Sequence, residues 1–101
     1  MADAEPDLDR IFMALADATR RRILLTLRAR PASVGELVAQ TTLSQPAVSK
    51  HLKVLETAGL VRRERDGQRI YSVIEFAPLI RAAVFVSQFE LTTEAALDRL
   101  D

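Results

Sequence analysis

One stretch of this sequence, SQPAVSKHLKVLETAGLVRRERDGQRIYSV, constrains the fold more than any other. Ser44 can cap a helix with Pro46 in its first turn, where the missing amide hydrogen costs little. Gly59 fits the position just past the end of this helix. Asp66-Gly67 then gives a strong signal for a tight turn between two strands. The stretch therefore predicts a short helix that leads directly into a β-hairpin.

The turn also predicts which residues of the two strands face each other. A two-residue turn at Asp66-Gly67 places Glu64 opposite Arg69 on the paired strand. Opposite charges at facing positions of an antiparallel ladder support such a pairing. We therefore expect Glu64 and Arg69 to be partners.

Three more helices are expected before this stretch. Asp7 can cap the first and Asp17 the second, which Pro31 ends. Ser33 can cap a short third helix, and Glu36 three residues later completes a capping-box pattern. Two short helices joined by a tight turn and followed by a hairpin describe a helix-turn-helix with a wing.

The C-terminal segment 77–100 reads as one long helix with too many apolar residues for a single buried stripe. They are Leu79, Ile80, Ala83, Val84, Phe85, Val86, Phe89, Leu91, Ala95 and Leu97. A helix that is apolar nearly all round needs a second partner for burial. One domain of 101 residues can cover one side, so another subunit is the natural cover for the other.

Composition limits the class of protein. A chain of 101 residues with 49% hydrophobic and 28% charged residues fits one soluble globular domain. The absence of cysteine excludes disulfides and thiolate metal sites. The acidic N-terminus does not resemble a secretory signal, and no apolar run approaches the roughly 20 residues that cross a bilayer. We expect a cytoplasmic protein that does not enter a membrane.

The predicted helix after Ser44 has two chemically different faces. On a helical wheel, Val48, Leu52 and Leu55 form a stripe suited to burial. A different side carries groups able to reach base edges or phosphates: Gln45, Pro46, Ser49, Lys50 and Lys53. The hairpin adds Arg62, Arg63, Arg65 and Arg69, so residues 43–74 hold six bases against three acids although the whole chain has no net charge. A shared polyanionic ligand, double-stranded DNA, explains both elements.

The segments ALADATRRRILLTL and SQPAVSKHLKVLETAGLVRRERDGQRIYSV, with the long last helix, resemble the ArsR/SmtB family of bacterial winged-helix repressors. The resemblance covers about residues 8–100. It implies a mostly α-helical winged helix-turn-helix of four helices, a β-hairpin and a fifth helix. It also implies a homodimer joined through the first and last helices, which binds an operator with two-fold symmetry.

The resemblance assigns roles to individual residues. The recognition helix would contact DNA through Ser44, Gln45, Pro46, Ser49, Lys50 and Lys53. The wing would use Arg62, Arg65, Asp66, Gly67 and Arg69. The dimer interface would include Leu8, Phe12, Val84, Phe85, Phe89 and Leu91. The resulting plan is one DNA-binding domain over 1–101, with a flexible arm over 1–7, a helix-turn-helix over 33–58, a wing over 60–74 and a dimerisation helix over 77–100.

The sequence departs from the metal-responsive members of that family. Those members carry Cys-x-Cys near the third helix, or Asp-x-His there with further ligands on the last helix. This chain reads Gly35-Glu36-Leu37-Val38-Ala39 at the third helix and has no histidine in the last. We therefore expect no metal site and no cofactor. The effector, if the protein has one, is an unknown small molecule or protein.

Several alternatives stay open. His51 can be a helix-packing residue or, against expectation, a metal ligand, and Arg20-Arg21-Arg22 can be ion-paired surface residues or phosphate contacts. A winged helix can also serve as a protein-interaction module without DNA binding, and a repressor can depend on a metal held by carboxylates alone. No catalytic residues are expected, because the chain lacks cysteine, a Gly-rich phosphate loop and a serine–histidine–acid arrangement.

Overall fold

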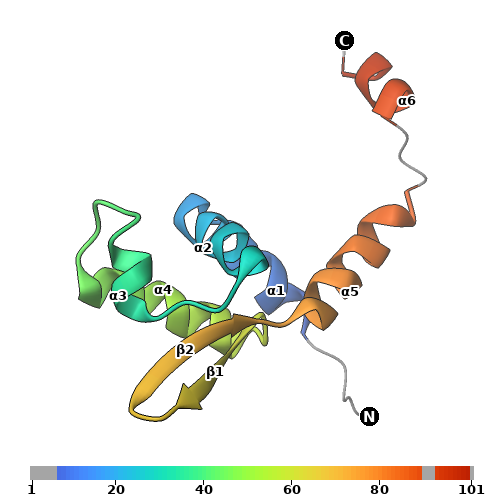
Figure 1. Ribbon diagram of the computed structural model, residues 1–101. Coiled ribbons are helices and arrows are strands. Elements are labelled where there is room, and N and C mark those ends of the chain that lie inside the picture. Colours follow the sequence, from blue (N-terminus) through green and yellow to red (C-terminus); the bar gives the residue numbers. More distant parts are fainter. Residues whose placement is uncertain (1–6, 90–92, 101) are drawn as a thin grey trace.

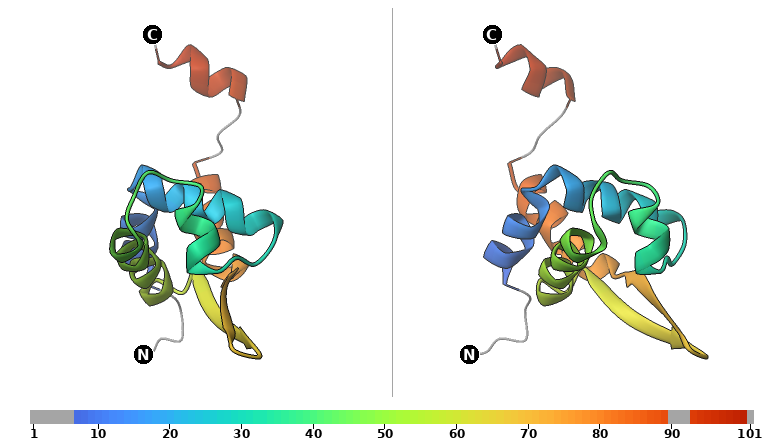
Figure 2. Two further views of the ribbon diagram at one scale, coloured as in Figure 1. Left: turned by 60° about the vertical axis from the view of Figure 1, so that its left-hand side comes forward. Right: turned by 90° about the vertical axis from the view of Figure 1, so that its left-hand side faces the viewer.

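The computed structural model describes residues 7–89 and 93–100 (Figure 1). Its elements in chain order are α1 (Leu8–Leu15), α2 (Ala18–Ala29), α3 (Val34–Val38), α4 (Gln45–Thr57), β1 (Val61–Asp66), β2 (Arg69–Ile74), α5 (Phe76–Ser87) and α6 (Thr93–Asp98). The two strands form an antiparallel hairpin that projects from the helical body (Figures 1 and 2). The mostly helical winged helix-turn-helix fold is confirmed.

The predicted helix caps are confirmed at four helix starts, where side-chain oxygens accept backbone N–H bonds: Asp7, Asp17, Ser33 and Ser44. Asp17 accepts from the amides of Thr19 and Arg20 at 2.8 and 3.1 Å. Ser33 and Glu36 form the expected reciprocal capping box. Each cap satisfies amides that the helix itself leaves without a partner.

One hydrophobic core joins the helices to the base of the hairpin. It consists of Ala14, Ile23, Leu24, Leu27, Ala32, Leu37, Val48, Leu52, Leu55, Ala58, Leu60 and Val61. The segment between α2 and α3 is tied to the hairpin by a bridge in which the amides of Ala32 and Ser72 donate to each other's carbonyl. The wing is therefore anchored at its base, while its far end stands free in solvent.

The expected register of the hairpin is wrong by two residues, because Glu64 lies opposite Tyr71. Asp66, not Glu64, lies opposite Arg69, so Gly67 and Gln68 form the turn. Gly67 has φ of 65°, which glycine adopts without strain. Below the turn, Val61 pairs with Ile74 at the edge of the core, and Val61 is buried. An exposed ion pair contributes less than this apolar contact, so the core sets the register.

The single helix expected over 77–100 is also wrong. Helix α5 ends at Ser87, and the separate helix α6 follows from Thr93. Two threonines occupy positions 92 and 93, and threonine is a poor residue for a helix interior and a good one near a helix start. The arm expected over 1–7 falls outside the described residues except for Asp7, and Leu91 falls outside them entirely. No helix among the described residues is long and apolar enough to cross a bilayer.

Candidate nucleic-acid interface

Helix α4 separates its two faces as predicted. Val48, Leu52 and Leu55 are 0%, 2% and 0% exposed and hold the helix against the core. Gln45 and Lys50 are exposed on a different side. The buried stripe fixes the orientation of the helix, so the polar face is presented to solvent as a rigid edge.

The start of α4 is shaped by its own cap. The hydroxyl of Ser44 accepts a bond from the amide of Ala47 at 3.3 Å, and Pro46 lies exposed in the first turn. The side chain of Gln45 therefore projects into solvent from the N-terminal end of the helix, where the helix dipole favours an approaching phosphate. Ser44 has a structural role in addition to any contact with a ligand.

Ser49 lies in a more enclosed place than the sequence indicates. It is half-buried and lines a hollow of about 180 Å³ between α4 and the hairpin, together with Ile70 and Ser72. Lys50 and Lys53 remain exposed on the outer side. Within the part of the chain that the structure describes, neither lysine has an ion-pair partner. Both ammonium groups are therefore available to an anion.

An ion pair joins the wing to α4. The guanidinium of Arg63 in β1 donates to the Glu56 carboxylate of α4 at 2.8 Å. Alternate strand residues share a face, so Arg65 lies on the same side of the hairpin as Arg63. Arg65 is exposed and has no carboxylate partner among the described residues. Helix α4 and one arginine of the hairpin therefore belong to one continuous surface.

Arg62 is placed differently from the other predicted wing contacts. Its guanidinium bonds to Glu64 at 2.6 Å and to Glu75 at 3.0 Å, on the opposite face of the hairpin from Arg65. The bonds to Glu64 and then to Glu75 raise the pKa of Arg62. Two carboxylates thus already neutralise this guanidinium. The strand period could have revealed the first pair, because positions 62 and 64 share a face.

The remaining wing residues gather at its tip. Asp66 and Arg69 face each other as the last pair before the turn, and both are exposed beside Gly67. The structure therefore brings Arg65, Asp66, Gly67 and Arg69 together at the end of the hairpin. Arg62 lies nearer its base.

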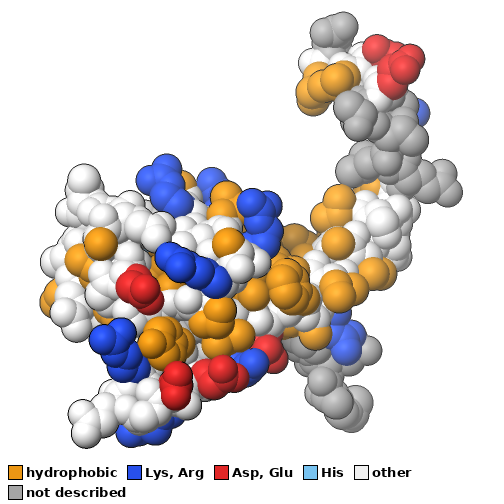
Figure 3. Space-filling model, in the orientation of Figure 1, with side chains coloured by type: hydrophobic (Ala, Val, Ile, Leu, Met, Phe, Trp, Pro, Cys, Tyr) orange, Lys and Arg blue, Asp and Glu red, His pale blue; other side chains and the backbone are white. Residues whose placement is uncertain are grey.

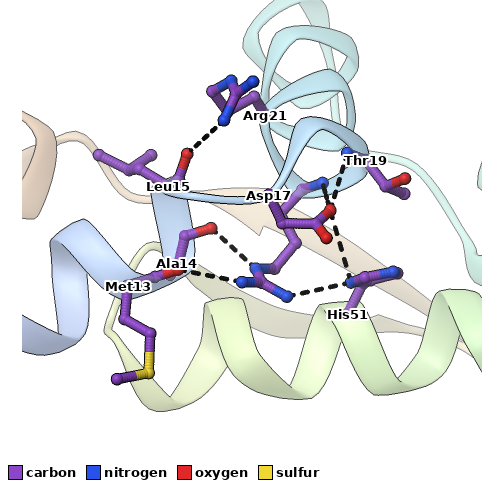
Figure 4. Close-up of polar contacts among 8 residues, drawn as sticks. Met13, Ala14, Leu15, Asp17, Thr19, Arg21 and His51 are labelled. Carbon is purple, nitrogen blue, oxygen red and sulfur yellow. Dashed lines mark hydrogen bonds and ion pairs between the residues drawn. The ribbon is translucent and has the colours of Figure 1, made fainter.

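The arginines at the start of α2 have roles that the sequence did not reveal (Figure 4). Arg20 donates to the carbonyls of Ala14 and Met13 at 2.8 and 3.0 Å, and Arg21 donates to the carbonyl of Leu15 at 2.8 Å. These carbonyls belong to the last turn of α1, where the helix itself leaves carbonyls without a full set of donors. Arg20 and Arg21 therefore fasten α1 to α2, and only Arg22 of the three remains a plain surface residue.

His51 is confirmed as a helix-packing residue. Its Nδ1 atom lies 3.3 Å from the Arg20 guanidinium and 4.0 Å from the Asp17 carboxylate, so it links α4 to the start of α2 (Figure 4). An arginine donates to Nδ1 only when that nitrogen carries no proton. The pKa of Asp17 is lowered, chiefly by the backbone bond from Arg20 and further by the amide of Thr19 and the charge of the Arg20 guanidinium. Among the described residues, no group of three or more His, Cys, Asp or Glu side chains could hold a metal ion.

A second surface, away from α4, is apolar. Helices α1 and α5 lie side by side (Figure 1), and Phe12 meets Phe85 edge to face with ring centroids 5.8 Å apart. Phe85 also contacts Phe89 at 5.6 Å. Val84 is 53% exposed and Phe89 65% exposed. Next to them is a hollow of about 470 Å³ lined by Leu8, Val84 and Phe85 among others. We call this surface the α1/α5 face.

Comparisons with known proteins agree with this geometry. The family described as "Bacterial regulatory protein, arsR family" matches residues 17–63. The regulator Rv2034 of Mycobacterium tuberculosis is 50% identical over 66 residues, which cover 64% of this chain and 62% of that protein. This chain thus spans less than two thirds of the length of that curated relative.

Solved structures extend the likeness over most of the chain. An ArsR-like transcriptional regulator from Rhodococcus sp. RHA1 superposes with a TM-score of 0.78 at 32% identity, covering 91% of this chain and 81% of that one. The homodimeric winged helix-turn-helix DNA-binding domain Mb0332 from Mycobacterium bovis gives a TM-score of 0.67 at 30% identity, with 82% and 79% covered. The chain therefore belongs to the ArsR family of bacterial regulatory proteins.

Proposed function

We propose that this protein is a homodimeric, sequence-specific DNA-binding transcriptional repressor. The observation that carries the proposal is the exposed polar edge of α4, fixed by its buried stripe and continuous with Arg65 of the wing. The repressors and regulators among its relatives support the same assignment.

The residues divide into base-reading and backbone-binding groups. Gln45 can form a bidentate pair with adenine, and Lys50 can donate to guanine in the major groove. Lys53 and Arg65 carry cations without carboxylate partners in the described part of the chain and suit phosphates, which supply affinity without sequence information. Arg69 and the turn at Gly67 would approach the flanking backbone. Arg62 would contribute less than Arg65, because Glu64 and Glu75 already bind it.

The α1/α5 face supports the dimer. Large apolar side chains exposed to water on two adjacent helices are typical of a surface that another subunit covers. A two-fold axis through this face would relate the α4 helices of the two subunits to each other. Such a pair matches an operator whose half-sites lie about one helical turn apart.

The signal that releases this repressor would not be a transition metal. The described residues lack a cluster of ligands for one, and the chain has no cysteine. A metal held by carboxylates alone is tested by adding zinc, nickel or manganese to the DNA complex, with unchanged affinity expected. The effector is then a small molecule or a protein.

DNA binding and protein interaction alone are separated by one experiment. Fluorescence anisotropy of the DNA upstream of the protein's own gene, at moderate salt with competitor DNA, should show saturable binding. The variant Lys50→Ala should weaken it, whereas Arg22→Ala, an exposed change on α2, should leave it unchanged. A protein that binds neither this DNA nor a selected random duplex more tightly than competitor would be an interaction module instead.

A further inference from the structure

A separate apolar hollow lies where α2, the end of β2 and the start of α5 meet. Its volume is about 330 Å³, which falls in the range of about 300–1,000 Å³ that is usual for small-molecule sites. Its apolar lining includes Leu24, Leu25, Ile74, Phe76 and Leu79. We call this hollow the α2 groove. No residue of α4 lines it, so it is distinct from the candidate nucleic-acid interface.

The walls of the α2 groove expose large apolar side chains to water. Leu25 is 57% exposed and Phe76 is 52% exposed. These two residues come from different elements and contribute to the same hollow, so their exposure is not a scatter of single surface residues. Covering them removes apolar area from water, which gives a ligand with an apolar body a favourable place to pack.

Two arginines bound the same groove. Arg21, Leu24, Leu25 and Arg28 recur at the spacing i, i+3, i+4 and i+7, which places them on one face of α2. The arginines are two helical turns apart, about 10 Å along the axis. No acidic side chain of residues 7–89 or 93–100 lines the groove. Figure 3 shows Lys and Arg side chains over α2 beside hydrophobic side chains on this side of the molecule.

The two arginines differ in what they already bind. Arg21 donates to the carbonyl of Leu15 and so holds the end of α1. Arg28 is exposed, and no carboxylate among the described residues pairs with it. Arg28 can therefore bind an external anion without giving up an internal contact.

We propose that the α2 groove binds an anionic amphiphile, a small molecule with an apolar body and a carboxylate head. The body packs on Leu24, Leu25 and Phe76, and the carboxylate pairs with the Arg28 guanidinium. The positive rim and the absence of acids select against cationic amphiphiles of the same shape. The binding does not depend on DNA, so it stands or falls separately from the proposed function.

Decanoate is a direct probe. Its affinity is compared with the affinities of 1-decanol and decyltrimethylammonium, each below its micellar concentration. Titration into the full chain with methyl-labelled leucine and isoleucine should shift the methyl signals of Leu24, Leu25 and Ile74. Decanoate should bind more tightly than decyltrimethylammonium. The variant Arg28→Gln should weaken decanoate by about tenfold, the usual loss for a bond to a charged group that is partly exposed. Arg28→Gln should leave the affinity for decanol unchanged.

The matched control is Arg22→Gln, which removes an equal charge from α2 outside the groove and should change the affinity of neither ligand. Three results would overturn the proposal. They are decanoate shifting only methyls of the α1/α5 face, decanoate binding no more tightly than decyltrimethylammonium, and decanoate keeping its full affinity for Arg28→Gln. Groove methyls that stay unshifted at every decanoate concentration would overturn the proposal as well.

Discussion

Replacing Arg20 with methionine tests the link between α1, α2 and α4. The change keeps an unbranched apolar stem but removes donors to the carbonyls of Ala14 and Met13 and to Nδ1 of His51. The backbone amide of Arg20 still bonds to Asp17, so the cap of α2 remains. The variant therefore isolates the contribution of the guanidinium.

The expected loss follows from these contacts. A hydrogen bond from a charged group contributes about 1.5–3 kcal/mol when buried, and about half of that when water can replace it. Ala14 is buried, so its carbonyl is left without the Arg20 donor, whereas the carbonyl of the exposed Met13 keeps the amide of Ala16 as a donor. We expect a loss of about 2 kcal/mol in the free energy of unfolding, or roughly 8–16 °C in Tm for a domain of this size.

Urea denaturation followed by circular dichroism measures this loss. The protomer concentration must be the same for all variants, because a dimer gains apparent stability with concentration. Arg22→Met is the control, since this exposed arginine should change stability by less than about 0.5 kcal/mol. If the free energy of unfolding of Arg20→Met lies within that margin of the wild-type value, the guanidinium does not hold the three helices together.

Three further changes test other parts of the account. Arg65→Ala should flatten the slope of log binding constant against log salt concentration by about 0.9 per lost phosphate contact. Anisotropy titrations at several salt concentrations between about 50 and 300 mM measure this slope. An unchanged slope would remove Arg65 from the interface. Val84→Glu should raise the dimer dissociation constant by about a hundredfold in sedimentation equilibrium, because a lone carboxylate would be buried; an intact dimer would place the interface elsewhere. The pKa of Asp17 is depressed in the folded state, so its stabilisation is present above its ordinary value of 3.8 and is lost as pH falls through the lower folded value. The wild type should lose stability below pH 3.8 more steeply than Asp17→Asn, and parallel acid curves would contradict this.

The features that the sequence predicted well are those determined by neighbours along the chain. A cap such as Asp17 or Ser33 needs only a side-chain oxygen and amides two or three residues later. Gly59 follows the same logic, since its φ of 77° at the end of α4 requires a residue without a side chain. The two faces of α4 follow from the helical period alone. Local rules sufficed in each case.

The errors arose where distant contacts decide. The register of the hairpin was inferred from a two-residue turn at Asp66-Gly67, with the exposed pair Glu64 and Arg69 as support, whereas the burial of Val61 beside Ile74 fixes it. The role of Arg20 was missed because its acceptors lie in another helix. The pairing of Arg63 with Glu56 likewise joins two elements whose approach depends on the whole fold. Sequence reasoning identified which residues form the candidate site, and the structure showed which of their charges are free.

The central claim is that the polar edge of α4 reads bases while Arg65 binds the backbone. Its most direct test is the affinity of the wild type and Gln45→Ala for an operator and for duplexes with each base pair substituted in turn. The account predicts that Gln45→Ala loses about 1–3 kcal/mol on the operator and becomes indifferent at one position in each half-site, with the salt dependence unchanged. A variant that keeps the wild-type preference at every position would show that this edge of α4 does not read the DNA.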